Sequence, residues 1–242
     1  MTNMKIALLI SGGGTTAEAI IRACNDGRLQ KVIVALVIAS KTDIPGIART
    51  KAAGVAGNDI ILLRPKDFSS PQEFGSAILA ECKVRGVDFV GQYGWLPQTP
   101  ANVIEAYQGM ITNQHPGPLD PGHPDFGGEG MYGRRVIAAR MLFVRRTNRE
   151  FWTEATAQRV AEHLDEGAVL GRRQVPILPE DTVETLQARL LPEEHALQIE
   201  TLQHFADGKV KELVRNEPLV RPEEYALLEE CKKEAIKLYP HG

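Results

Sequence analysis

The sequence predicts an α/β fold, in which a Rossmann-like, mostly parallel sheet carries helices on both of its faces. Short, continuous apolar runs of strand length recur in the first half of the chain, as is typical of parallel strands that are buried on both sides. Segments with apolar residues at helical spacing lie between these runs. Strands that alternate with helices in this way indicate parallel pairing through crossover connections.

The first half of the chain contains five expected strands. One helix start is especially well marked, because Ser70 is an N-cap residue, Pro71 takes the first helical position and Glu73 stands three residues after the serine. The expected strands are residues 5–10, 32–39, 59–63, 88–91 and 110–113. The expected helices are residues 17–24, 45–53, 71–82 and 102–107.

The second half of the chain begins with residues 117–134, which are rich in glycine and proline. A structureless loop of this length inside a compact domain is usually functional or a linker, and its place after a histidine favours an active-site loop. We expect a helix at 131–144, strands at 156–160 and 168–175, a long helix from 182 to about 202, and a last helix from 222.

Composition limits the class of protein. The chain has 242 residues with 43% apolar and 24% charged residues and a net charge of −3, which is ordinary for a globular protein and indicates no polyanionic partner. No apolar run is long enough to span a membrane, and the first residues do not resemble a signal peptide. The odd number of cysteines indicates buried free thiols in a reducing cytoplasm. The three cysteines are Cys24, Cys82 and Cys231.

A polar pair follows the fifth expected strand. In extended chain, residues two apart point to the same side, so Asn113 and His115 share one face. Pro116 favours extended geometry for His115 and marks a strand end, and the ends of strands in open α/β sheets are where ligands bind. The alternative is a turn with a solvated histidine.

A glycine turn joins the first expected strand to the first helix. Glycines allow a tight turn, and the amides at a helix N-terminus attract an anion such as phosphate. The pattern is neither a Walker A loop nor the dinucleotide Gly-x-Gly-x-x-Gly motif. It indicates a mononucleotide-like phosphate site, and the alternative is a tight strand–helix turn. The residues of this phosphate loop are Ser11, Gly12, Gly13, Gly14, Thr15 and Thr16.

Asn113, His115 and Asp165 form a candidate catalytic set. A carboxylate beside an imidazole fixes its orientation, and an amide can donate to a developing oxyanion, so the set suits transfer of an acyl or formyl group to an amine. Spacing alone does not bring Asp165 to His115, and Asp165 could equally form an Asx turn.

A basic set follows the glycine-rich loop. It could form a solvated helix face, an anion site or an RNA contact. Few aromatic residues stand between the arginines, which argues against single-stranded nucleic acid as a partner. The set comprises Arg134, Arg135, Arg140, Arg145, Arg146 and Arg149, with Arg172 and Arg173 later.

Several motifs together resemble the glycinamide ribonucleotide (phosphoribosylglycinamide) formyltransferase family. The stretch from Met4 to Thr16 resembles the family's opening strand and its Ser-Gly-x-Gly-Ser-Asn phosphate loop. The similarity extends over about residues 4–213. Further motifs are Asn113-Gln114-His115-Pro116, the Asp-x-Gly element Asp165-Glu166-Gly167, Val175-Pro176 followed by Glu180 to Leu186, and Arg189-Leu190-Leu191-Pro192-Glu193-Glu194-His195.

The resemblance implies a formyltransferase domain at 1–213, a helical extension at 214–242, and a role in de novo purine synthesis. The formyl group of 10-formyltetrahydrofolate would pass to the amine of glycinamide ribonucleotide, with no metal. By likeness, His115 transfers protons, Asp165 orients it, and Asn113 stabilises the oxyanion. The phosphate loop binds the substrate phosphate, and Glu194 binds its ribose. The folate pocket would be lined by Tyr93, Gly94, Trp95, Leu96, Val160 and Asp165.

The departures from the family pattern cluster at the folate and acceptor pockets. Thr15 and Thr16 replace Ser-Asn, the stretch 94–97 lacks the family's arginine, and Gln158 stands where the family has a histidine. The alternatives are another folate-dependent formyltransferase, acting on a sugar-nucleotide amine or on methionyl-tRNA, or a non-catalytic nucleotide- or folate-binding module. We expect small-molecule substrates, no nucleic-acid or membrane partner, and a monomer or homodimer.

Overall fold

The computed structural model describes residues 3–242. The strands are β1 (Met4–Ile10), β2 (Val32–Ala39), β3 (Ile60–Leu62), β4 (Phe89–Gln92), β5 (Ile111–His115), β6 (Trp152–Arg159) and β7 (Val169–Pro176). They are hydrogen-bonded in the order β3-β2-β1-β4-β5-β6-β7. The pairings from β3 to β5 are parallel, whereas β6 and β7 are antiparallel. The predicted α/β class with a mostly parallel sheet is confirmed.

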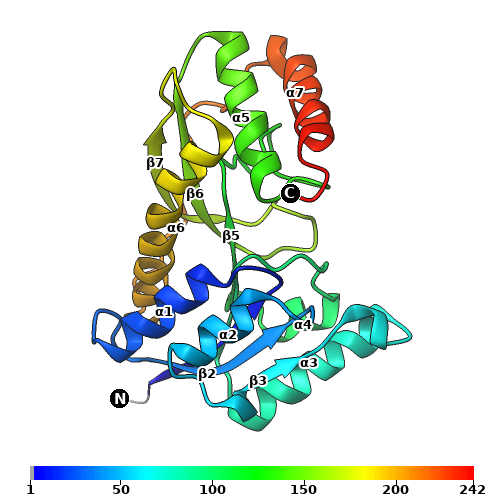
Figure 1. Cartoon of the computed structure of the whole chain (residues 1–242), viewed down its shortest axis with the longest axis vertical. Helices are drawn as coiled ribbons and strands as arrows, with labels where there is room; N and C mark the ends of the chain where they lie inside the picture. Colours follow the sequence, from blue (N-terminus) through cyan, green and yellow to red (C-terminus); the bar gives the residue numbers. More distant parts are fainter. Residues whose placement is uncertain (1–2) are drawn as a thin grey trace. The chain divides into compact units, whose positions relative to one another are not determined.

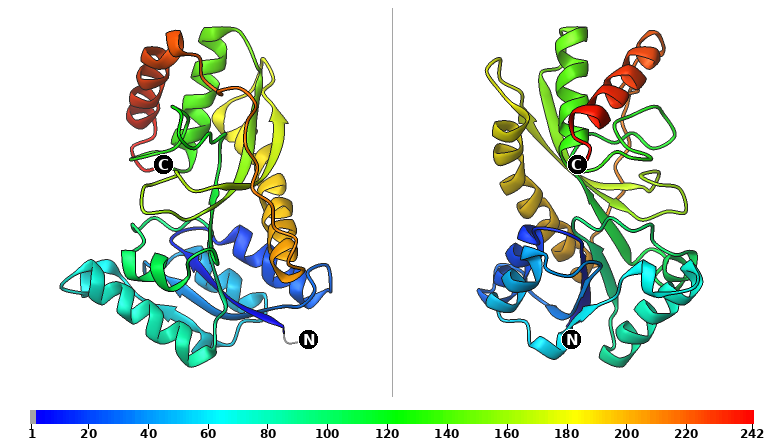
Figure 2. Two further views of the ribbon diagram at one scale, coloured as in Figure 1. Left: turned by 180° about the vertical axis from the view of Figure 1, so that it is seen from behind. Right: turned by 45° about the vertical axis from the view of Figure 1, so that its right-hand side comes forward.

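The chain forms two compact units, which are described separately. The first contains the residues up to Asn113 together with Gln198–Val210, and the second contains Gln114–Leu197 together with Lys211–Gly242. In the first unit, α1 (Thr15–Asn25) and α2 (Pro45–Ala52) cover one face of the parallel strands. The longer α3 (Pro71–Arg85) and the short α4 (Ala101–Ala106) cover the other face (Figure 2).

Helices on both faces explain why the strands of the first unit read as unbroken apolar runs. Ile6, Leu8 and Ile10 of β1 pack with Ile20 of α1 and Phe89 of β4, and none of these side chains is exposed. The predicted start of α3 is also confirmed, because the Ser70 hydroxyl accepts a hydrogen bond from the Glu73 amide at 3.2 Å.

The second unit pairs two long helices with the antiparallel strands. In Figure 1, α5 (Arg134–Thr147, green) and α7 (Tyr225–Leu238, red) lie side by side. Their shared core contains Phe126 of the glycine-rich loop, Phe143 of α5, and Leu228 and Cys231 of α7. α6 (Val183–Ala206) continues through Pro192 and contributes residues to both units. Three 3-10 segments lie at Gly57–Asp59, Pro65–Asp67 and Pro222–Glu224.

Most expected elements are present, with shifted ends. α5 begins at Arg134 and not at Met131, and the strand expected at 156–160 is β6, which begins at Trp152. The start of β6 was missed because Thr153 and Glu154 are polar although both are fully buried. Cys82 and Cys231 are buried free thiols, and Cys24 is half-buried. None of the helices in the described part of the chain is long and apolar enough to cross a membrane.

Candidate active site

His115 ends β5 in a buried position. Its side chain is only 3% exposed, so the alternative of a turn with a solvated histidine is wrong. Nε2 of the ring lies 3.3 Å from the carbonyl oxygen of Phe126 in the glycine-rich loop (residues 117–134). A carbonyl can only accept a hydrogen bond, so the ring donates to it from Nε2.

Asp165 approaches the other side of the same ring. Its Oδ1 lies 3.6 Å from His115 Nδ1, close enough for an ion pair with the protonated ring. The Gln158 amide donates to Oδ1 at 2.6 Å, and the Gly128 backbone N–H donates to Oδ2 at 2.9 Å. Both carboxylate oxygens therefore have a donor that fixes their direction. The backbone of Asp165 has φ of 60°, which aspartate tolerates better than most residues.

The contacts of His115 and Asp165 define what the pair can do chemically. One ring nitrogen faces a carbonyl and the other faces a carboxylate, so the imidazolium has an acceptor for each of its protons. The carboxylate fixes the direction of the ring, and an imidazole is a group that can take up and release protons in acid–base chemistry. Such a pair can manage the protons of an acyl or formyl transfer.

Asn113 lies two residues before His115 on β5 and belongs to the first unit. It is half-buried and lies in register with Gln92 of β4. Its carboxamide supplies N–H donors of the kind that stabilise an oxyanion.

The expected phosphate loop, residues 11–16, forms the turn between β1 and α1 in the first unit. Gly14 has φ of 68° and is the N-cap of α1, where it supplies no side-chain acceptor for the first helical amides. A Cβ at Gly14 would lie 2.5 Å from the Cα of Gly46, so a larger residue does not fit. The Ser11 hydroxyl is bonded to Ser40 at 2.6 Å and accepts the Leu96 amide at 2.9 Å. The close approach to Gly46 explains one of the three glycines as a packing requirement.

The stretch expected to bind folate contains both core and exposed residues. The ring of Tyr93 packs in the core of the first unit, and burial raises the pKa of its phenol. Trp95 stacks on Phe74 with ring centroids 6.2 Å apart, whereas Leu96 is 44% exposed. Val160, in the second unit, is half-buried just after β6. Gly94 has φ of 71°, and its carbonyl accepts the Ser11 amide at 3.0 Å.

Glu194 of α6 is a buried acid with a raised pKa. Burial raises its pKa to about 7, and the Gln114 side chain opposes this by lowering it. Oε1 of Glu194 has no hydrogen-bond partner among residues 3–242. A buried carboxyl oxygen without a partner is costly, and a ligand hydroxyl would satisfy it.

Sequence reasoning missed the groups that hold the His115–Asp165 pair. In the sequence Gln158 stands out only as a departure from the family pattern, although its amide is a direct partner of Asp165. The other two partners are backbone groups of Phe126 and Gly128, which have no sequence signature. The only available signal was the glycine-rich composition of residues 117–134.

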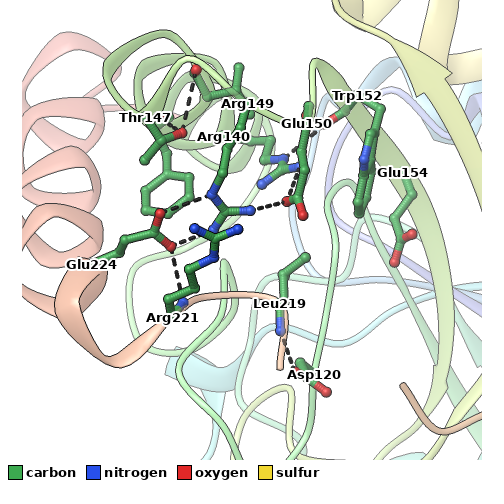
Figure 3. A network of polar contacts seen from close by, with 12 residues as sticks. Asp120, Arg140, Thr147, Arg149, Glu150, Trp152, Glu154, Leu219, Arg221 and Glu224 are labelled. Carbon is green, nitrogen blue, oxygen red and sulfur yellow. Dashed lines mark hydrogen bonds and ion pairs between the residues drawn. The ribbon is translucent and has the colours of Figure 1, made fainter. Parts of the chain in front are cut away.

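Most arginines of the basic set make contacts within the second unit. The set is therefore not simply a solvated helix face. Arg140 is fully buried between the rings of Phe126 and Trp152, and burial lowers its pKa to about 10. Arg149 makes ion pairs with Glu150 and Glu224 (Figure 3). Within residues 3–242, no cluster of three or more His, Cys, Asp or Glu residues could hold a metal ion.

Comparison with known proteins identifies the family. A family model described as formyl transferase matches residues 4–202. Two similar proteins are the phosphoribosylglycinamide formyltransferases of Haemophilus influenzae, 32% identical over 86% of this chain and 89% of that protein, and of Vigna unguiculata chloroplasts, 32% identical over 91% of this chain. The chain spans 66% of the Vigna protein.

Solved structures agree with this assignment. The glycinamide ribonucleotide transformylase 1 of Symbiobacterium toebii is 30% identical with a TM-score of 0.74, over 87% of this chain and 94% of that one. The phosphoribosylglycinamide formyltransferase of Brucella melitensis is 31% identical with a TM-score of 0.71, over 88% of this chain and all of that one. The chain therefore belongs to the phosphoribosylglycinamide formyltransferase family of folate-dependent formyltransferases.

Proposed function

We propose that this chain transfers the formyl group of 10-formyltetrahydrofolate to the amine of glycinamide ribonucleotide, a step of purine synthesis. The observation that carries the proposal is the buried His115 ring, with Asp165 at 3.6 Å on one side and a loop carbonyl on the other. Membership of the family supports the identity of both substrates.

The chemistry needs proton management at the amine. The amine nitrogen bonds to the formyl carbon, the bond from that carbon to the folate nitrogen breaks, the amine loses a proton and the folate nitrogen gains one. In this scheme His115 carries protons between them, Asp165 orients and stabilises the ring, and the Asn113 carboxamide donates to the oxygen that becomes negative.

The remaining predicted residues hold the substrates. Residues 11–16 would bind the substrate phosphate. This is supported by the N-terminus of α1, whose N-cap residue Gly14 has no side chain to cap the first helical amides. Glu194 would accept a ribose hydroxyl, which is supported by its Oε1 atom having no partner within the described chain.

For the folate we propose residues 93–96, Val160 and Asp165. The Trp95 indole nitrogen is buried without a hydrogen-bond partner in the described part of the chain, so this stretch offers a free donor. The folate itself supplies the formyl group. We further infer that residues 1–213 form the formyltransferase domain and that residues 214–242 are an addition to it.

The test is an assay of formyl transfer that follows release of the deformylated folate by absorbance. The native chain should turn over with glycinamide ribonucleotide, and His115→Asn should lower kcat by about a hundredfold or more. His163→Asn is the matched control, because His163 is an exposed histidine two residues from Asp165. Native kcat in His115→Asn would contradict the proposal.

The choice of acceptor is tested in the same assay. Turnover with a sugar-nucleotide amine but not with glycinamide ribonucleotide would keep the chemistry and change the substrate. A chain that binds either ligand, seen as a raised melting temperature, but does not turn over would be a binding module.

A further inference from the structure

Three hydrogen bonds within the second unit join the C-terminal segment (residues 211–242) to the glycine-rich loop. Arg215 Nε donates to the Leu119 carbonyl at 3.1 Å. The Leu219 amide donates to Asp120 Oδ2 at 2.9 Å (Figure 3). Lys232 Nζ, on α7, donates to the Gly127 carbonyl at 3.0 Å. The family model ends at residue 202, so these contacts are additional to the matched region.

Residues 126–128 of the loop face the His115–Asp165 pair. The Phe126 carbonyl accepts from His115, and the Gly128 amide donates to Asp165. Gly127 lies between these two contacts, and its carbonyl is the group that Lys232 binds. Within three consecutive residues, the loop is therefore fixed to the imidazole, to the carboxylate and to α7.

A half-buried carboxylate, Asp125, lies in the same loop. Asp125 accepts the amides of Asp120 at 2.6 Å and Gly127 at 2.8 Å. Burial raises the pKa of Asp125, whereas those two N–H donors and the positive charges of His115 and Lys232 lower it. Asp125 thus ties the backbone of Asp120 to that of Gly127, the residue whose carbonyl Lys232 binds.

Lys232 is held in a fixed direction. Cys231 and Ala235, beside it on α7, are buried in the same core as Phe126. The residue before α7, Glu224, pairs with Arg149 of the loop that follows α5 (Figure 3). The Lys232 side chain is 16% exposed, and its ammonium also lies 3.8 Å from Glu229. A mostly buried lysine side chain on a packed helix forms a directed hydrogen bond, unlike a mobile surface lysine.

We propose that Lys232 is a positioning residue for the reaction, which holds residues 126–128 through the Gly127 carbonyl and so fixes the geometry of His115 and Asp165. The proposal rests on the proposed function, in which that pair transfers the protons. Lys232 touches the loop and not the reacting atoms. Its removal should therefore lower kcat and leave the KM of both substrates nearly unchanged.

The test compares three variants of the full chain. Lys232→Met removes the ammonium and keeps the aliphatic stem, and Lys232→Arg restores a cationic donor. Lys233→Met is the matched control, because Lys233 is exposed on the same helix and loses the same charge. Thermal unfolding first verifies that all three fold.

Two measurements then decide. In Lys232→Met, the ring-nitrogen chemical shifts of His115, assigned with His115→Asn, should change and the amides of residues 126–128 should exchange faster with deuterium. The kcat should fall by about tenfold to a hundredfold, the range for misplacing a catalytic group by up to about 1 Å. Lys232→Arg should recover much of the loss, and Lys233→Met should match the native chain.

The His115 spectrum separates this inference from the proposed function. Unchanged His115 shifts in Lys232→Met overturn the positioning role, whether or not the native chain transfers formyl groups. Changed shifts with a native kcat also overturn it. If the native chain itself shows no transfer, the proposed function fails, and a shifted His115 spectrum in Lys232→Met still supports the effect of Lys232 on the pair.

Discussion

Replacing Gly127 with alanine should damage the His115–Asp165 pair without touching either residue. A Cβ at Gly127 would lie 2.6 Å from the Cβ of Asp165 and 2.8 Å from Cδ2 of Leu119. The leucine methyl can rotate away, but the Cβ of Asp165 moves only with its backbone. The added methyl group should therefore push Asp165 away from the loop.

The size of the effect follows from the distances. An ordinary contact for a Cβ begins at 3.4 Å, so the separation from Asp165 must grow from 2.6 Å by roughly 0.8 Å. Misplacing a catalytic group by about 1 Å can cost about a hundredfold in rate, which corresponds to about 2.7 kcal/mol in the activation barrier. We expect Gly127→Ala to lower kcat by up to that factor.

The assay is steady-state formyl transfer with both substrates saturating. The control is Gly57→Ala, because a Cβ at Gly57 meets no atom within 4 Å. Gly127→Ala with native kcat and an unchanged melting temperature would refute the reasoning, since the loop would then have absorbed the methyl group without moving Asp165.

Three further predictions concern stability. Arg215→Met removes the nearest cation from the fully buried Glu154 and should lower the free energy of unfolding in urea by about 3 kcal/mol. The control is Arg28→Met at an exposed arginine, which should cost less than about 1 kcal/mol. A loss that small in Arg215→Met would contradict the prediction. Phe126→Ala empties a fully buried site packed on Phe143 and should cost about 3–4 kcal/mol, whereas alanine at the exposed Phe151 should cost less than about 1 kcal/mol. Burial raises the pKa of Glu194 from 4.5 to about 7, so the folded chain keeps this proton to higher pH than the unfolded chain does. The free energy of unfolding should therefore fall by roughly 3 kcal/mol as the pH rises from about 4.5 to 7. Glu194→Gln should remove that part of the fall, and parallel pH profiles of the two proteins would contradict the assignment.

Local signals made much of the fold predictable. The strands of the first unit are short apolar runs because helices cover both of their faces, and that pattern is visible without coordinates. The start of α3 could be predicted because Ser70, Pro71 and Glu73 act within one helical turn. β6 was placed four residues late because Glu154 is buried by pairing with the distant Arg215, and only the tertiary structure reveals that pair.

The candidate site was less predictable because its supports are distant backbone groups. The resemblance to the family named His115 and Asp165, but spacing did not bring them together. The Phe126 carbonyl and the Gly128 amide that hold them belong to residues with no chemical signature of their own. The catalytic roles of Asn113, His115 and Asp165 stay predictions.

The contact from Lys232 to Gly127 joins positions 105 residues apart, which has a consequence for biosynthesis. During translation, the segment with His115 and the glycines leaves the ribosome long before α7 is made. Contacts this far apart in sequence form late, because closing the intervening chain costs entropy. A nascent chain that ends before α7 carries every proposed catalytic residue but has no lysine at the Gly127 carbonyl. Residues 126–128 therefore reach their final contacts only after α7 has been synthesised.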